Sequence, residues 1–200
     1  MIVVVGLPVL ERSEPPRAGG LATAIARGAA AAGATVQLMG KVGDDPEGDL
    51  VLLDLAAAGI GHPAILRDPV RRTPGGSRRS GLAENPAPTL EPADLELGLR
   101  YVPDFRVIVL AAPDLPTLLR PAADAAGYAA AHLIMIAKAQ TPAVGLPERS
   151  TVLTIPRGSP DGGSALPALV AAYAVALDAG EDSETAWGRA TARAGVGSRP

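Results

Sequence analysis

The sequence predicts one α/β domain, with a mostly parallel sheet covered by helices on both faces. Short apolar runs alternate with helical segments along almost the whole chain, the order that gives parallel sheets. The first run, Ile2–Val5, is apolar without interruption, as in a strand buried on both faces. A length of 200 residues suits a single core. Since no repeat or linker divides the chain, we expect a single three-layer α/β/α domain over residues 1–200.

The first half of the chain supplies the clearest elements. Leu21–Ala32 is helical by its alanine-rich composition, and Gly33 ends that helix. Thr35–Met39 is the next predicted strand, and Pro46–Ala58 the next helix, with its proline in the first turn. The apolar face predicted for this second helix consists of Leu50, Leu53 and Ala57.

The segment Arg67–Pro88 differs from the rest, because it mixes prolines and glycines with two arginine pairs. We expect a surface excursion with at most one short hairpin. Its arginines either bind a phosphate or partner, or are solvated loop charges, which is the commoner case. Regular structure resumes after it, with helices predicted at 92–99, 115–126, 165–179 and 183–194, and strands at 106–111, 132–137 and 151–155.

Composition excludes several classes of function. The net charge is −3 and the pI near 5.4, so nothing favours binding to nucleic acid or to an anionic membrane. The absence of cysteine and the presence of only two histidines argue against thiol chemistry and against a structural zinc site, and we expect no dedicated metal-binding residues. No apolar run is long enough to span a bilayer, and the start of the chain lacks a basic leader. We therefore expect a cytoplasmic protein.

Two glycine motifs carry a family resemblance. A Gly19-Gly20 pair opens the first helix, and the sequence MGKVGDDPEGDL places Gly40, Gly43, Asp45 and Gly48 between the second strand and the second helix. Three glycines and one acid at this spacing resemble the corresponding block of the ribokinase-like (PfkB) carbohydrate kinases. The resemblance implies a ribokinase-like fold in which Gly19, Gly20 and Asp45 contact the substrate.

The same resemblance assigns a role to Glu11. Members of the family carry an aspartate soon after the first strand that binds sugar hydroxyls, and Glu11 lies near that position with one more methylene. They then insert strands that form a lid over the sugar. Because only seven residues, RSEPPRA, separate Glu11 from Gly19, we expect the lid to be largely absent.

The C-terminal block departs from the family pattern. The family motif, Asp-Thr-x-Gly-Ala-Gly-Asp, holds the transferring phosphate at a helix N-terminus, and its last aspartate is the general base. Here Asp161 takes the first position of the motif, and Pro167 stands where the base is expected. In a shifted register, Gly162, Gly163 and Ser164 form a substitute phosphate loop. The resemblance covers roughly residues 1–66 and 161–200.

Each candidate residue also has a purely structural interpretation. Asp45 either binds a ligand or fixes a turn and caps the helix that Pro46 begins, and we favour the cap. The Gly19-Gly20 pair either admits a sugar or only makes a tight turn. Glu11 is at least as consistent with a solvated loop acid. Asp161 is the best remaining candidate for a base, but a cap in a Pro-Asp-Gly-Gly turn is favoured.

Two functions from different classes follow. The first is a kinase-like protein that has lost efficient phosphoryl transfer and at most binds a sugar or nucleotide, without a cofactor. The second is a minimal ATP- and Mg²⁺-dependent kinase of a sugar or nucleoside, with Asp161 as base. Open edge strands also allow a homodimer. A nicotinamide-binding domain is disfavoured, because Gly6 is followed by Leu7 and Pro8 rather than by a glycine-rich turn.

Overall fold

The computed structural model describes residues 1–75, 86–138, 145–155 and 165–193. Its centre is a six-stranded sheet in which every neighbouring pair of strands is parallel. The order across the sheet is β5-β4-β1-β6-β7-β8. The strands are β1 (Ile2–Val5), β4 (Val36–Gly43), β5 (Ile65–Asp68), β6 (Val107–Leu110), β7 (His132–Lys138) and β8 (Ser150–Ile155). The predicted α/β/α architecture with a mostly parallel sheet is confirmed.

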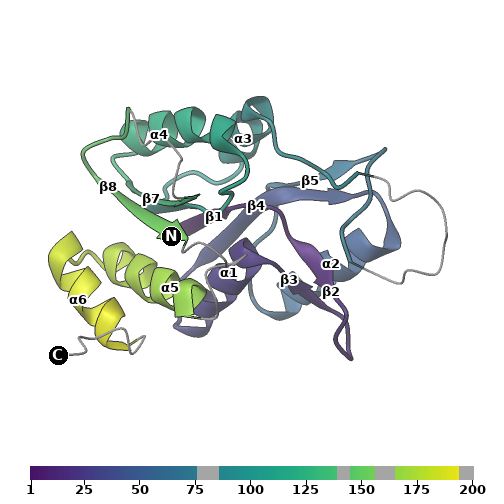
Figure 1. The fold of residues 1–200 in the computed structure, drawn as a ribbon, viewed down its shortest axis with the longest axis horizontal. Helices are drawn as coiled ribbons and strands as arrows, with labels where there is room; N and C mark the ends of the chain where they lie inside the picture. The colour runs from purple at the N-terminus through teal and green to yellow at the C-terminus, as the bar shows by residue number, and fades with distance from the viewer. Residues whose placement is uncertain (76–85, 139–144, 156–164, 194–200) are drawn as a thin grey trace.

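Helices cover both faces of the sheet (Figure 1), and two hydrophobic cores, one on each face, hold the layers together. Along β1, Ile2 and Val4 belong to one core, whereas Val3 and Val5 belong to the other, as the two-residue period of a strand requires. The first core is covered by α1 (Leu21–Ala31), α2 (Pro46–Ala57), α5 (Ala165–Asp178) and α6 (Ser183–Arg193), and the second by α3 (Pro92–Leu99), the 3-10 turn η1 (Pro116–Leu118) and α4 (Leu119–Tyr128). None of the described helices is long and apolar enough to cross a membrane.

A small antiparallel pair of strands lies between β1 and α1. It consists of β2 (Val9–Glu11) and β3 (Arg17–Gly19). One further bridge joins Leu10 to Gly75, and the Leu10 amide donates to the carbonyl of Pro74 at 2.8 Å. Within the described residues this pair has only three residues in each strand, and the expectation that the lid is largely absent stays a prediction. The sequence did not indicate them, because such short strands carry too few alternations to be recognised.

The predicted apolar face of α2 is wrong. Leu50 and Leu53 are 41% and 67% exposed, and Ala57 is also exposed, whereas Val51 and Leu55 are fully buried. The reason is that α2 contains leucine or valine on most of its surface, so that periodicity alone did not identify the buried side. The helix itself has the predicted bounds to within one residue.

The strand order reverses at β1. From β1 the chain moves outward through β4 to β5, then returns to the other side of β1 and continues through β6 and β7 to β8. The connections that leave β1 and β6 therefore diverge at the carboxyl edge of the sheet. In open parallel sheets ligands bind at this edge, so the residues that lie here are candidates for a binding site.

Candidate functional site

Helix α1 begins at this carboxyl edge without a side-chain cap. Its N-cap residue, Gly20, has φ +89° and ψ +165°, a conformation that strongly favours glycine, and no side chain caps the helix. The first intrahelical bond from the backbone of this turn is donated by Ala24 to the Gly20 carbonyl at 2.9 Å. The amides of Leu21, Ala22 and Thr23 precede that bond and have no intrahelical acceptor. They can donate to a hydroxyl or an anion.

Glu11 lies over the glycine pair. Strands β2 and β3 pair Val9 with Gly19 and Glu11 with Arg17, which places the Glu11 side chain diagonally across Gly19. A Cβ atom built on Gly19 would lie 2.0 Å from Glu11 Oε1. The structure therefore brings Glu11 beside the Gly19-Gly20 pair, while substrate contact by these residues stays a prediction. A carboxylate beside free amides offers both an acceptor and donors, which matches the hydrogen-bonding pattern of a sugar hydroxyl.

Helix α5 begins at the same edge as α1. Its last residue, Asp178, binds the amino group of Met1 at 2.6 Å, so α5 runs from the carboxyl edge of the sheet to the amino edge, as α1 does. The two helices touch where a Cβ on Gly28 would lie 2.8 Å from the Ala171 Cβ. Gly28 and Ala171 lie at nearly the same distance along their helices from the first residue of α1 and of α5. The two N-termini therefore lie at about the same height above the sheet edge. Their dipoles direct partial positive charge toward the same region.

Pro167 is the third residue of α5. As a proline it is tolerated in a first turn, where its missing N–H would have no intrahelical acceptor. It also supplies neither a carboxylate nor an amide donor to anything bound at this helix end. Asp161, Gly162, Gly163 and Ser164, which the sequence analysis assigned to catalysis and phosphate binding, lie outside the described residues.

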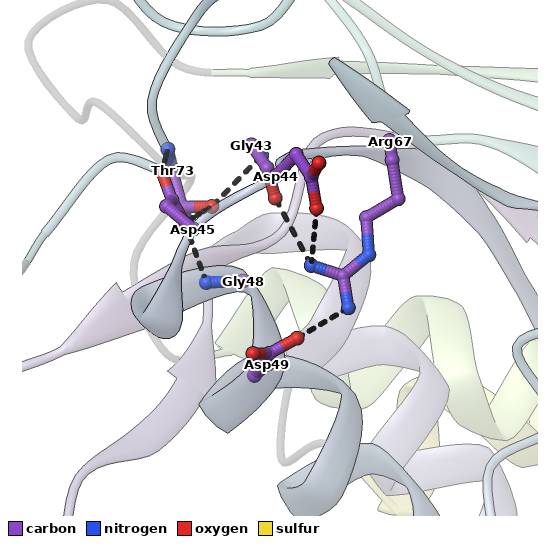
Figure 2. Close-up of polar contacts among 7 residues, drawn as sticks. All are labelled: Gly43, Asp44, Asp45, Gly48, Asp49, Arg67 and Thr73. Atoms are coloured by element: carbon purple, nitrogen blue, oxygen red, sulfur yellow. Dashed lines mark hydrogen bonds and ion pairs between the residues drawn. The ribbon is translucent and has the colours of Figure 1, made fainter. Parts of the chain in front are cut away.

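Asp45 is held in a closed hydrogen-bond network at the N-terminus of α2 (Figure 2). Its Oδ1 accepts from the Gly48 amide at 2.7 Å and from the Thr73 hydroxyl at 2.8 Å, and its Oδ2 accepts from the Thr73 amide at 2.8 Å. The Thr73 hydroxyl in turn accepts from the Gly43 amide at 2.9 Å. Asp45 is 8% exposed. The structure thus shows the helix cap that the sequence analysis favoured, while substrate contact by Asp45 stays a prediction.

The electrostatics of Asp45 follow from this network. Burial acts to raise the pKa of the carboxyl group, but the amide hydrogen bonds from Thr73 and Gly48, the Thr73 hydroxyl and the charge of Arg72 together outweigh it. The pKa therefore lies below its ordinary value, and the side chain is charged at neutral pH.

The glycines of the second motif permit close backbone packing around this network. A Cβ on Gly40 would lie 2.4 Å from the Gly6 carbonyl oxygen, one on Gly43 would lie 2.3 Å from Asp45 Oδ2, and one on Gly48 would lie 2.4 Å from the Gly43 carbonyl oxygen. Each distance is shorter than any real Cβ contact. The spacing that resembles the kinase family is therefore required here by packing alone.

Sequence reasoning missed three residues that matter at this edge. Thr73 closes the Asp45 network, and Arg67 binds the Gly43 carbonyl at 3.2 Å and Asp49 at 2.5 Å, with Asp44 4.0 Å away (Figure 2). In α1, the fully buried Thr23 hydroxyl has no hydrogen-bond partner within the described part of the chain. No motif could have identified Thr73 and Arg67, because their partners are distant in sequence, and the burial of Thr23 follows from the packing of α1.

The same region offers no evident metal site. Among the residues that the structure describes, no group of three or more histidine, aspartate or glutamate side chains is placed to hold a metal ion. The donor set fits a phosphate, through helix N-termini, better than it fits a dedicated cation site.

Comparison of the fold with solved structures gives strong matches at low sequence identity. A PfkB protein from Polaromonas sp. JS666 has a TM-score of 0.69 at 16% identity, over 96% of this chain and 94% of that one. Arabidopsis thaliana ribokinase, complexed with ribose and ATP, has a TM-score of 0.64 at 16% identity, over 96% and 90% of the two chains. Trypanosoma brucei brucei adenosine kinase has a TM-score of 0.66 at 12% identity, over 98% and 97%.

The chain has a ribokinase-like fold. Sequence comparison alone matches it to no family model and to no curated protein. The chain thus shares its fold with kinases of sugars and nucleosides, but its sequence is very different from theirs. At such identities the likeness establishes the architecture, and function has to be argued from the site.

Proposed function

We propose that this protein is a kinase-like binding protein that recognises a sugar or a nucleotide at the carboxyl edge of its sheet and has lost efficient phosphoryl transfer. The observation that carries the proposal is Pro167 in the first turn of α5. In the register of the family motif, this residue stands in place of the general base. Loss of a general base costs about 10²- to 10⁴-fold in rate, and loss of an amide donor to the transferring group adds a further factor.

The binding half of the proposal rests on the geometry around α1. Glu11 lies against Gly19, and the first-turn amides of α1 lack both a side-chain cap and intrahelical acceptors. The N-terminus of α5 is level with that of α1, which favours an anionic group between the two helices. Among the residues that the structure describes, only the short β2–β3 pair is placed to cover this site, so we expect a bound ligand to stay in contact with water. That access lowers the rate of any transfer further.

Calorimetric titration tests the binding half. We expect measurable heats with ATP, with ADP or with at least one member of a panel of pentoses, hexoses and nucleosides. Glu11→Gln keeps the shape of the side chain and removes its charge, so it should weaken sugar binding at least several-fold. Glu14→Gln, in the β2–β3 turn, is the matched control and should leave affinity unchanged. Absence of binding to every ligand of the panel would refute the proposal.

A minimal active kinase is the alternative function. In it Asp161 is the base, Gly162, Gly163 and Ser164 hold the phosphate, and Glu11 and Asp45 hold the substrate, with Mg²⁺ bridging the phosphates of ATP. The supporting observation is the place of this acid in the sequence, four residues before the first residue of α5. Under this alternative, ATP and a suitable alcohol yield ADP, and Asp161→Asn abolishes that yield.

A further inference from the structure

Strand β8 forms one margin of the sheet (Figure 1) and has the features of a pairing surface. In the part of the chain that the structure describes, β8 pairs with β7 and with no other strand. Its sequence, STVLTI, contains no charge, no proline and no glycine, and every residue in it except serine and leucine is β-branched. Such an edge readily accepts another extended backbone.

The two margins of the sheet differ in charge. Strand β5, at the opposite margin, has the sequence ILRD, in which Arg67 and Asp68 lie on the edge strand itself. Charged side chains of this kind discourage strand pairing. Of the two margins of the described sheet, the β8 margin is therefore the one suited to association, and an assembly with one suited margin per molecule closes as a dimer and does not grow into a fibre.

The backbone amides of successive residues in β8 point alternately toward β7 and away from it. The Leu133 amide of β7 donates to the Arg149 carbonyl at 2.9 Å, and the register pairs Leu133 with Ser150. In a parallel ladder with this register, the amides of Thr151, Leu153 and Ile155 bond to β7. Those of Ser150, Val152 and Thr154 consequently point away from the sheet. Val152 and Thr154 also have exposed side chains.

We propose that two copies of this chain associate by antiparallel pairing of their β8 strands about a two-fold axis at Val152, giving one continuous sheet. Antiparallel strands exchange hydrogen bonds only between residues whose amides face each other. In the register centred on Val152, this residue pairs with itself, and Ser150 of each copy pairs with Thr154 of the other. Every outward amide of β8 then finds a carbonyl acceptor.

A second copy fits this margin better than an unrelated extended peptide does. Self-pairing places a valine opposite a valine and a serine opposite a threonine, and both are favourable cross-strand pairs. No like charges meet, because the strand has none. On the α5 side of β8, the Thr151 hydroxyl is 3.0 Å from the Tyr173 hydroxyl, and the Tyr173 ring packs edge-on against Trp187. This packing holds the strand extended in the free monomer, which lowers the entropy cost of pairing.

Sedimentation equilibrium of the full chain tests the proposal. We expect a species of about twice the 20.1 kDa chain mass, formed at concentrations up to roughly 1 mM, where a micromolar Kd is saturated. A monomer over the whole range overturns the proposal, and so does a series of larger polymers. In hydrogen exchange measured by NMR, the outward amides of Val152 and Thr154 should gain protection as concentration rises.

Three variants test the register. Val152→Pro removes an outward amide that makes no bond to β7, so the fold persists and the dimer is lost. Val152→Lys and Val152→Glu each place like charges on the axis and should be monomeric alone, whereas an equimolar mixture of the two should restore a dimer. Val70→Lys, at an exposed position after β5, is the control and should leave the mass unchanged. If the Val152→Lys variant stays dimeric, the proposed interface is wrong.

Discussion

At the scale of single residues, the Asp45 network explains why a glycine-rich turn follows β4. One carboxylate accepts hydrogen bonds from the amides of Gly48 and Thr73 and from the Thr73 hydroxyl. It thereby joins the end of β4, the start of α2 and a segment nearly thirty residues further along the chain. Since these bonds occupy the carboxylate, its first role is to shape the site.

Asp45→Asn should lower the free energy of unfolding by about 1–3 kcal/mol. The amide side chain retains an acceptor for the Gly48 cap but presents an NH₂ group, in place of Oδ2, to the buried Thr73 amide, and an unmet buried donor costs this much. Urea denaturation measures the change. Asp49→Asn, at an exposed position of α2, should change stability far less, and equal losses in the two variants would contradict this account.

The lowered pKa of Asp45 also predicts a pH dependence. A carboxyl group with a folded pKa below its unfolded value stabilises the protein above the unfolded pKa of 3.8, and that contribution is lost as the pH falls through the lower folded value. The stability difference between the wild type and Asp45→Asn should therefore be constant near neutral pH and shrink below pH 3.8. The other acids with lowered pKa, Asp68 and Asp182, are common to both proteins and cancel.

Gly20→Ala should impair both folding and ligand binding. A Cβ at φ +89° is strained, at a cost of about 1–3 kcal/mol, and it crowds the Leu7 carbonyl at 3.3 Å. Gly33→Ala, beyond the other end of α1, incurs similar strain at φ +88° with open space around it. Calorimetry should find binding weakened only by Gly20→Ala. Equal binding by the two variants would show that the α1 N-terminus takes no part in recognition.

At the scale of elements, the site depends on the close parallel packing of α1 and α5. Gly28→Ala should destabilise the protein by about 1–3 kcal/mol, because the new Cβ would lie 2.8 Å from that of Ala171. Ala171→Gly in the same chain should recover part of the loss. Gly188→Ala, in α6 with nothing within 4 Å, should instead stabilise by about 0.5–1 kcal/mol. Thermal unfolding of the four proteins measures these changes, and a stabilising Gly28→Ala would refute the packing argument.

The sequence predicted the longer elements well and the short ones poorly. Apolar runs such as Val107–Leu110, the glycine Gly33 after α1 and the Asp45-Pro46 start of α2 carry strong local signals, so these elements lie within a residue or two of their predicted bounds. Strands β2 and β3 were missed because three residues show no readable period, and β5 was missed because its sequence, ILRD, is not an uninterrupted apolar run. The buried face of α2 was wrong, because only tertiary packing decides which side of an apolar helix is covered.

At the scale of the whole molecule, the site is produced by topology. Helices α1 and α5 both begin at the carboxyl edge of the parallel sheet and pack against each other, although their first residues are far apart in sequence. The sequence predicted Glu11, Gly19 and Gly20 at this edge through a family resemblance. It could not predict Thr73 or Arg67, whose partners are fixed only when β4, β5 and α2 meet.

The fold of this molecule and the residues at its candidate site support different conclusions about phosphoryl transfer. The architecture is that of sugar and nucleoside kinases, and the helix N-termini at the carboxyl edge suit a phosphate. Yet Pro167 lies in the first turn of α5, and in the register proposed from the sequence it stands in place of the base. We infer that ligand recognition at such an edge persists without the group that would take a proton from an alcohol.

Release of ADP from ATP is the measurement that tests this inference most directly. Purified protein is incubated with ATP, Mg²⁺ and each sugar or nucleoside of the panel, beside an Asp161→Asn variant and a no-acceptor control. The account predicts the same background rate in all three samples, together with calorimetric binding of at least one ligand. Acceptor-dependent ADP formation by the wild type that Asp161→Asn abolishes would contradict it and establish an active kinase.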